Sequence, residues 1–124
     1  NIFVAEFIGS PKMNIIKINK EHITNSNTLH LFNNKITFDN LEFKDEIYIG
    51  IRPEHISVKD NCEIKVDVKI DLVENLGFEK IVYSKFYENQ IIIKSSENIS
   101  NHSLKISFSK DKVLFFDKDK NRIR

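Results

Sequence analysis

The sequence predicts a mostly β fold: one small closed or half-closed barrel, or two sharing a core, with a short helix at the N-terminus. Apolar and charged residues alternate along several short stretches, as they do in strands with one buried and one solvent-facing side. Isoleucine is abundant and alanine is almost absent, which favours strands over helices. These stretches follow one another at short intervals, a spacing typical of small barrels.

The N-terminal segment has helical spacing. Phe3 and Phe7 lie four residues apart, so a helix over residues 1–8 would have one apolar face. Gly9 suits a left-handed C-terminal cap, and Pro11 prevents the helix from continuing.

Four strands are expected in the first half of the chain. They are predicted at residues 14–18, 29–32, 35–38 and 47–51. The second and third should form a hairpin, because Asn33 and Asn34 between them tolerate the positive φ of a tight turn. The fourth should end before Pro53.

The second half contains the clearest alternation. From Ile64 to Leu72 every apolar side chain is expected on one side and every charged side chain on the other. Further strands are predicted at residues 81–87, 90–94, 104–108 and 113–116, the first two as a second hairpin. The charged end, residues 117–124, is expected to be a turn with a fraying tail.

Composition narrows the function classes. Nineteen basic and 18 acidic residues give a net charge of +1, which provides no strong field for nucleic acid or anionic membrane. One cysteine, Cys62, excludes an internal disulfide and suits a reducing cytoplasm. No apolar run is long enough to span a bilayer. Because the chain starts without a methionine, we expect that a preceding portion is missing.

Catalytic, cofactor-binding and metal-ligating residues are not predicted, so we expect no enzyme activity. The histidines lack the close spacing of metal ligands; they are His22, His30, His55 and His102. Cys62 lies in a polar turn with nothing to mark it as a nucleophile. The only glycines are Gly9, Gly50 and Gly77, too scattered for a phosphate-binding loop.

A barrel of the OB type offers one functional interpretation. Such barrels bind single-stranded nucleic acid through aromatic side chains on a basic face. Tyr83, Phe86 and Tyr87 would supply the aromatic platform. The balanced charge argues against nucleic-acid binding. A stand-alone OB-type module that binds single-stranded nucleic acid or a small anion is therefore kept only as the alternative hypothesis.

Three short strings point to a family. Residues 3–14 read F-V-A-E-F-I-G-S-P-K-M-N, residues 50–55 read G-I-R-P-E-H, and residues 73–79 read V-E-N-L-G-F-E. In this order they resemble the C-terminal regulatory (transport-associated OB-fold, TOBE) domain of the ATP-binding subunit of MalK-type ABC sugar importers. The residues that carry the resemblance are Phe3, Phe7, Gly9, Ser10, Pro11, Met13, Asn14, Gly50, Arg52, Pro53, Glu54, His55, Glu74, Leu76, Gly77 and Glu79.

The resemblance implies a role for the whole chain. Residues 1–124 would be a single regulatory OB-fold-like domain without cofactors, and the ATPase domain of its parent would use ATP and Mg²⁺. The implied partners are a second copy of the chain, its own ATPase domain, the membrane subunits of the transporter and, as in some relatives, a regulatory protein. Nucleic acid is not expected. The implied location is the cytoplasmic side of the cell membrane.

Two expectations concern individual side chains. Arg52, between Gly50 and Pro53, should satisfy carbonyl groups or a carboxylate at a strand end. Alternation can bury only part of the 113–116 run, so Phe115 and Phe116 are candidates for a two-fold contact, with Phe116 expected to stay exposed.

The missing phosphate loop generates the first prediction. The chain should neither bind Mg-ATP with micromolar affinity nor hydrolyse it, because no residues here can cradle the phosphates and hold Mg²⁺. Calorimetric titration and a phosphate-release assay measure both properties, and micromolar binding would overturn the domain assignment.

Overall fold

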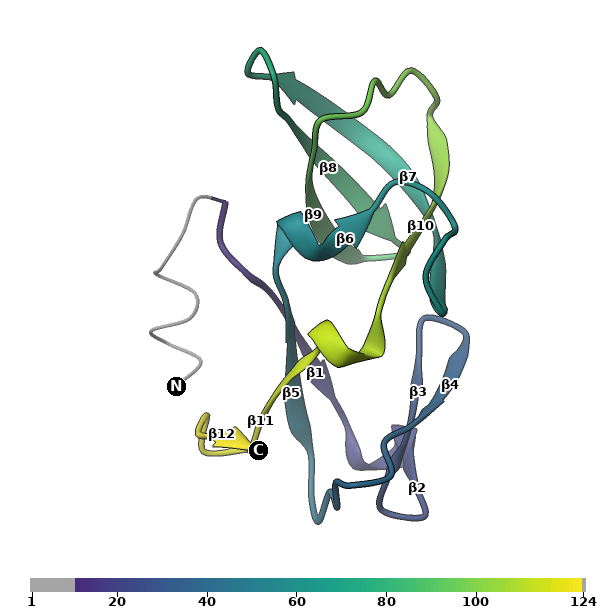
Figure 1. Cartoon of the computed structure of the whole chain (residues 1–124). Coiled ribbons are helices and arrows are strands. Elements are labelled where there is room, and N and C mark those ends of the chain that lie inside the picture. The colour runs from purple at the N-terminus through teal and green to yellow at the C-terminus, as the bar shows by residue number, and fades with distance from the viewer. Residues whose placement is uncertain (1–10, 124) are drawn as a thin grey trace.

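The structure is a computed structural model that describes residues 11–123, so the predicted helix over residues 1–8 lies outside the described residues. Within that range the chain forms twelve strands and three short 3-10 turns. The mostly β prediction is therefore confirmed. Figure 1 shows two groups of strands, with β7, β8, β9 and β10 in the upper half of the view and β1 to β5 and β11 in the lower half.

The first sheet joins distant parts of the chain. Its order is β1-β5-β11-β12, with bounds Asn14–Ile18, Ile47–Ile51, Leu114–Phe116 and Arg122–Ile123. All its pairs are antiparallel. The first two strands have the bounds that the sequence predicted. The prediction that residues 117–124 form a turn with a fraying tail is wrong in part, because residues 122–123 form a strand that pairs with β11.

The second sheet contains the longest strand. Its order is β6-β10-β7-β8-β9, with bounds Ile56–Ser57, Ser103–Phe108, Ile64–Asn75, Lys80–Phe86 and Asn89–Ser95. The predicted second hairpin is β8–β9, and its turn is Tyr87–Glu88. Tyr87, expected at the end of a strand, therefore lies in that turn, where its φ is 54°.

The third sheet is the small hairpin unit β2-β3-β4. Its strands are Ile23–Thr24, Thr28–Leu31 and Asn34–Thr37. The three 3-10 turns are η1 (Lys20–His22), η2 (Pro53–His55) and η3 (Lys110–Lys112).

The β3–β4 turn lies one residue earlier than the sequence suggested. Phe32 and Asn33 occupy it, with φ of 51° and 66°. A positive φ costs a bulky residue roughly 1–2 kcal/mol, but burying a phenylalanine contributes about 1.5–3 kcal/mol. Phe32 is only 7% exposed, and its ring contacts Phe86 edge-on at 5.1 Å. Tertiary packing therefore decides this turn against local preference.

A β-bulge interrupts the long alternation of β7. Ile64, Val66 and Val68 are buried, as predicted. The register of β7 against β8 then shifts between Ile70 and Leu72, which leaves Asp71 as the extra residue. Leu72 consequently faces outward and is 59% exposed. The predicted continuation of the buried side to Leu72 is wrong for this reason.

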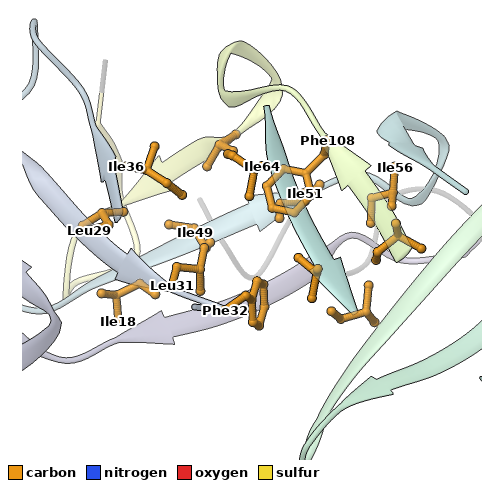
Figure 2. Packing of buried hydrophobic residues seen from close by; sticks show 14 of the residues in the cluster. Ile18, Leu29, Leu31, Phe32, Ile36, Ile49, Ile51, Ile56, Ile64 and Phe108 are labelled. Atoms are coloured by element: carbon orange, nitrogen blue, oxygen red, sulfur yellow. The ribbon is translucent and has the colours of Figure 1, made fainter. Parts of the chain in front are cut away.

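One hydrophobic cluster connects the sheets. It contains residues from all three, including Ile18, Leu29, Ile49, Val82 and Ile106. Figure 2 shows the side chains of this cluster converging from the different strands. The two halves of the view in Figure 1 thus share a single core.

The side chain of Asn14 fastens the first sheet to the second. Its Oδ1 accepts a hydrogen bond from the Ile92 N–H at 2.8 Å, and its Nδ2 donates to the Ile92 carbonyl at 2.9 Å. Nδ2 also lies 3.1 Å from the Ile51 carbonyl, to which it donates. This side-chain amide therefore pairs with Ile92 as a neighbouring strand would. Asn14 is 7% exposed, so water has little access to these groups, and loss of the bonds would leave buried polar atoms unpaired at a cost in free energy.

The second prediction follows from these bonds. Asn14→Ala should lower the free energy of unfolding by about 2–3 kcal/mol, because the main-chain groups of Ile92 and Ile51 lose buried partners. Urea unfolding measures the change, and amide exchange at Ile92 should accelerate. Asn101→Ala, at an exposed position, is the control. Equal stability of the two variants would contradict a fastening role.

Candidate functional site

The first two strings meet in the first sheet. Pairing of β1 with β5 places Asn14 opposite Ile51 and Ile15 opposite Gly50. Met13 and Phe116 form a small buried cluster on the face of this sheet around Gly50. A Cβ on Gly50 would collide with the Met13 sulfur and stand 3.1 Å from Phe116 Cε2. Gly50 is therefore required by close packing.

This cluster overturns the expectation for the C-terminal aromatics. Phe115 is 6% exposed and Phe116 is 3% exposed. Phe115 packs into the main core, and Phe116 packs against Met13 on the opposite face of the sheet. Both faces of β11 are thus covered, so the prediction that Phe116 remains exposed for a two-fold contact is wrong.

The rest of the second string forms η2. Pro53 is buried, Arg52 and His55 are half-buried, and Glu54 is exposed. The Arg52 carbonyl accepts a hydrogen bond from the His55 N–H at 2.9 Å. The Arg52 guanidinium makes no hydrogen bond or ion pair within residues 11–123, so the predicted pairing with carbonyls or a carboxylate is not found there. Pro11 is half-buried ahead of β1. The remaining residues of the first string lie outside the described residues: Phe3, Phe7, Gly9 and Ser10.

The third string lies apart from the other two, at the end of the β7–β8 hairpin (Figure 1). Gly77 has φ of 97°, and its N–H donates to Asn75 Oδ1 at 3.0 Å. The N–H of Leu76 donates to the Glu79 carbonyl at 2.8 Å, which closes the turn. The positive φ of Gly77 explains why the string needs its glycine. Glu74 is exposed on the same hairpin.

The hairpin exposes large apolar side chains. Leu72, Leu76 and Phe78 are 59%, 56% and 91% exposed, and we call these three the apolar hairpin tip. Glu79 lies beside it and forms an ion pair with Lys94 at 3.4 Å. Sequence reasoning missed Leu72 because of the bulge, and it missed Phe78 although a phenylalanine directly after a turn glycine was a usable signal. Three large exposed apolar side chains on one hairpin make it a candidate interaction surface.

A groove lies at the other end of β7. It has a volume of about 620 Å³. The β3–β4 turn forms one side: Asn34 Nδ2 donates to the Lys65 carbonyl of β7 at 2.8 Å. The β8–β9 turn forms another side through Phe86 and Tyr87. We call this the lysine groove; its charged residues are Lys65, Asp67, Lys69, Asp71, Lys85 and Lys105.

The aromatic residues suggested from sequence separate in the structure. Phe86 and Tyr87 line the lysine groove, with their rings edge-on at 4.7 Å. Tyr83 is half-buried and does not line it. Phe32, which sequence reasoning had assigned to a strand, completes the rim beside Phe86.

The carboxylates with shifted pKa values lie away from both surfaces. The N–H of Lys110 donates to Glu63 at 2.6 Å and lowers the pKa of that carboxyl, with help from Ser109. The N–H of Glu46 lowers the pKa of Asp45, and Lys118, 3.0 Å away, lowers it further. Both carboxylates thus accept hydrogen bonds that hold loops in place.

Neither metal binding nor membrane crossing finds support in the described part of the chain. Within residues 11–123 no three His, Cys, Asp or Glu side chains are arranged to hold a metal ion. None of the helical turns there has the length and apolar character to cross a bilayer.

Comparisons with known proteins agree on one family. Residues 9–56 match the family model of the MalK OB fold domain. The chain is 37% identical over 89 residues to the maltose/maltodextrin import ATP-binding protein MalK of Aliivibrio fischeri, an overlap covering 67% of this chain and 24% of that protein.

Two further relatives extend the overlap. The ABC transporter ATP-binding protein YurJ of Bacillus subtilis is 33% identical over 135 residues, covering 94% of this chain and 36% of that protein. The sn-glycerol-3-phosphate import ATP-binding protein UgpC of Psychromonas ingrahamii is 32% identical over 101 residues, covering 80% and 26%. The chain thus spans about a quarter to a third of the length of these relatives.

The packing around Gly50 generates the third prediction. Gly50→Ala should destabilise the fold by about 1–2 kcal/mol, because the new methyl group displaces the buried side chain of Met13. Arg52→Ala should stay within about 0.5 kcal/mol of the parent, since no described partner is lost. Thermal or urea unfolding measures both effects.

A double-mutant cycle tests the cause. Met13→Ala removes the sulfur with which the new methyl group collides, so Gly50→Ala should cost less in that background. Strictly additive effects would show that Gly50 is needed for another reason.

Proposed function

Because this chain belongs to the family of MalK-type OB-fold domains, we propose that it is the non-catalytic regulatory and dimerisation domain of the ATP-binding subunit of an ABC importer. The observation that supports this most strongly is the match of residues 9–56 to the MalK OB fold domain. The relatives are import ATP-binding proteins about four times longer than the overlap. The ATPase domain, with its ATP and Mg²⁺, would lie in the part of the subunit that this chain does not span.

The proposed transporter imports a sugar or a related solute. The relatives are named for maltose/maltodextrin and for sn-glycerol-3-phosphate, which supports this class of substrate. The domain would work at the cytoplasmic face of the membrane, where its subunit contacts the membrane subunits. Its direct partners would be its own ATPase domain, a second copy of itself and a regulatory protein.

We assign the self-contact to the apolar hairpin tip instead of the C-terminal aromatics. Phe78 is 91% exposed, whereas Phe116 is buried. In a two-fold dimer the same patch on each copy meets its counterpart, so a protruding apolar hairpin can bury itself against its equivalent. The occupant that we propose for this patch is therefore the second copy.

Three side chains make a small contact. An interface of this size is well below that of a stable dimer, so the isolated chain should associate weakly. In the complete subunit the same contact would act as a tether. It would hold separated ATPase domains at an effective concentration of roughly millimolar, which turns their reassociation into an intramolecular step.

The fourth prediction concerns Phe78. In the complete ATP-binding subunit, Phe78→Ser should reduce the fraction of dimer that persists without nucleotide and should lower the ATPase rate of the assembled transporter, because the tether loses its largest apolar contact. Sedimentation and phosphate release measure these two effects.

Tyr87→Ser is the matched control, since Tyr87 is 81% exposed but lies in the β8–β9 turn, outside the hairpin tip. Removal of the whole domain should reproduce the Phe78→Ser effect more strongly. If both the dimer and the ATPase rate survive removal of the domain, the tether role is wrong.

A further inference from the structure

We propose that the lysine groove binds a small phosphate monoester whose organic part carries a ring. The proposal rests on the contacts within the groove and does not depend on the transporter function above. Four lysines and two aspartates surround the groove, and aromatic rings line its rim.

Carboxylates neutralise only part of the positive charge. Asp67 pairs with Lys105, with 3.2 Å between Oδ1 and Nζ. Asp71 Oδ2 lies 3.8 Å from Lys85 Nζ. The side-chain ammonium of Lys69 makes no hydrogen bond or ion pair within residues 11–123. The ammonium group of Lys69 thus has three donors available for a ligand.

Two lysines near Lys69 add positive charge that a bound anion would stabilise. Lys85 is the cross-strand partner of Lys69, and like charges directly opposite each other destabilise a sheet. Lys65 Nζ donates to the carbonyls of Asp60 and Cys62 at 2.8 and 2.7 Å. These neutral acceptors hold the Lys65 ammonium in place but leave its charge uncompensated. A bound phosphate would compensate this charge.

The rim supplies a surface for a ring. The ring of Tyr87 is 81% exposed and meets Phe86 only edge-on, so a face of it remains open. Tyr87 also has φ of 54°, which costs a bulky residue roughly 1–2 kcal/mol. For Phe32 burial offsets such a cost, but the exposed ring of Tyr87 gains no comparable burial. A two-residue hairpin turn requires a positive φ, which Asn or Gly adopts at lower cost, but the chain has an exposed tyrosine there.

The size of the groove selects a small molecule. Its volume of about 620 Å³ lies within the range of roughly 300–1,000 Å³ typical of small-molecule sites. A phosphate near Lys69 and a ring against Tyr87 would use both features together. Sugar phosphates and nucleoside monophosphates share this chemistry, and the experiment distinguishes between them.

The fifth prediction is a titration of the chain by calorimetry or by amide chemical shifts, with four probes. They are glucose 6-phosphate, adenosine 5′-monophosphate, inorganic phosphate and glucose. At least one of the two monoesters should bind about fivefold or more tightly than inorganic phosphate, because the ring adds stacking. Whichever monoester binds more tightly identifies the source of the ligand, and glucose should not bind.

Variants test which residue binds the phosphate of the ligand and which residue contacts its ring. Lys69→Gln should weaken binding of the monoester about tenfold, the value expected for loss of one charged hydrogen bond. Tyr87→Ser should abolish the advantage over inorganic phosphate. Lys112→Gln removes an exposed lysine outside the groove, and Phe78→Ser alters the apolar hairpin tip; both should bind normally. Circular dichroism verifies that each variant is folded.

Several results would overturn the proposal. These are no binding of either monoester, equal affinity for inorganic phosphate, or equal losses from Lys69→Gln and Lys112→Gln, which would indicate a nonspecific charge effect. An acidic peptide that binds more tightly than both monoesters would also overturn it. Because Phe78→Ser tests the dimer and Lys69→Gln tests the groove, failure of one proposal leaves the other intact.

Discussion

The amide side chain of Asn14 is the interaction on which the arrangement of the sheets depends. Its bonds to both main-chain groups of Ile92 attach β1, and with it β5 and β11, to the edge strand β9 of the second sheet. With the sheets fastened at this edge, their apolar sides close on one core. Main-chain pairing of β1 with β9 would require several residues of each strand to run side by side. The Asn14 side chain provides the same two hydrogen bonds at one residue.

Close packing on the other face of the first sheet decides where apolar surface remains free. Gly50 lets Met13 and Phe116 approach the sheet, so the C-terminal aromatics are covered within the chain. Among residues 11–123, the large apolar side chains left exposed are Leu72, Leu76 and Phe78 on the β7–β8 hairpin and Tyr87 in the β8–β9 turn. For this reason we propose that the expected self-contact lies on the β7–β8 hairpin and not at the C-terminus.

One strand, β7, carries both candidate surfaces, and a single bulge separates them. Before Asp71 its outward side presents Lys65, Asp67 and Lys69 to the groove. After Asp71 the shifted register turns Leu72 outward toward the apolar hairpin tip. An uninterrupted strand would have buried Leu72 with Val68 and extended the charged side to the turn. The bulge thus allows an ionic surface and an apolar surface to lie on one long strand.

Alternation of side chains and the family strings were sufficient to determine the fold class, the bounds of β1 and β5, both hairpins and the family. These features depend on neighbours along the chain, so the sequence contains them. The turn at Phe32, the burial of Phe116 and the outward position of Leu72 depend on contacts between distant residues. Local preference disfavours a phenylalanine at positive φ, and burial of Phe32 in the core, against the ring of Phe86 more than fifty positions away, compensates for it. The lysine groove has the same origin: its lysines alternate along strands in the sequence, but strand pairing across β10, β7 and β8 brings them together and leaves Lys69 without a carboxylate.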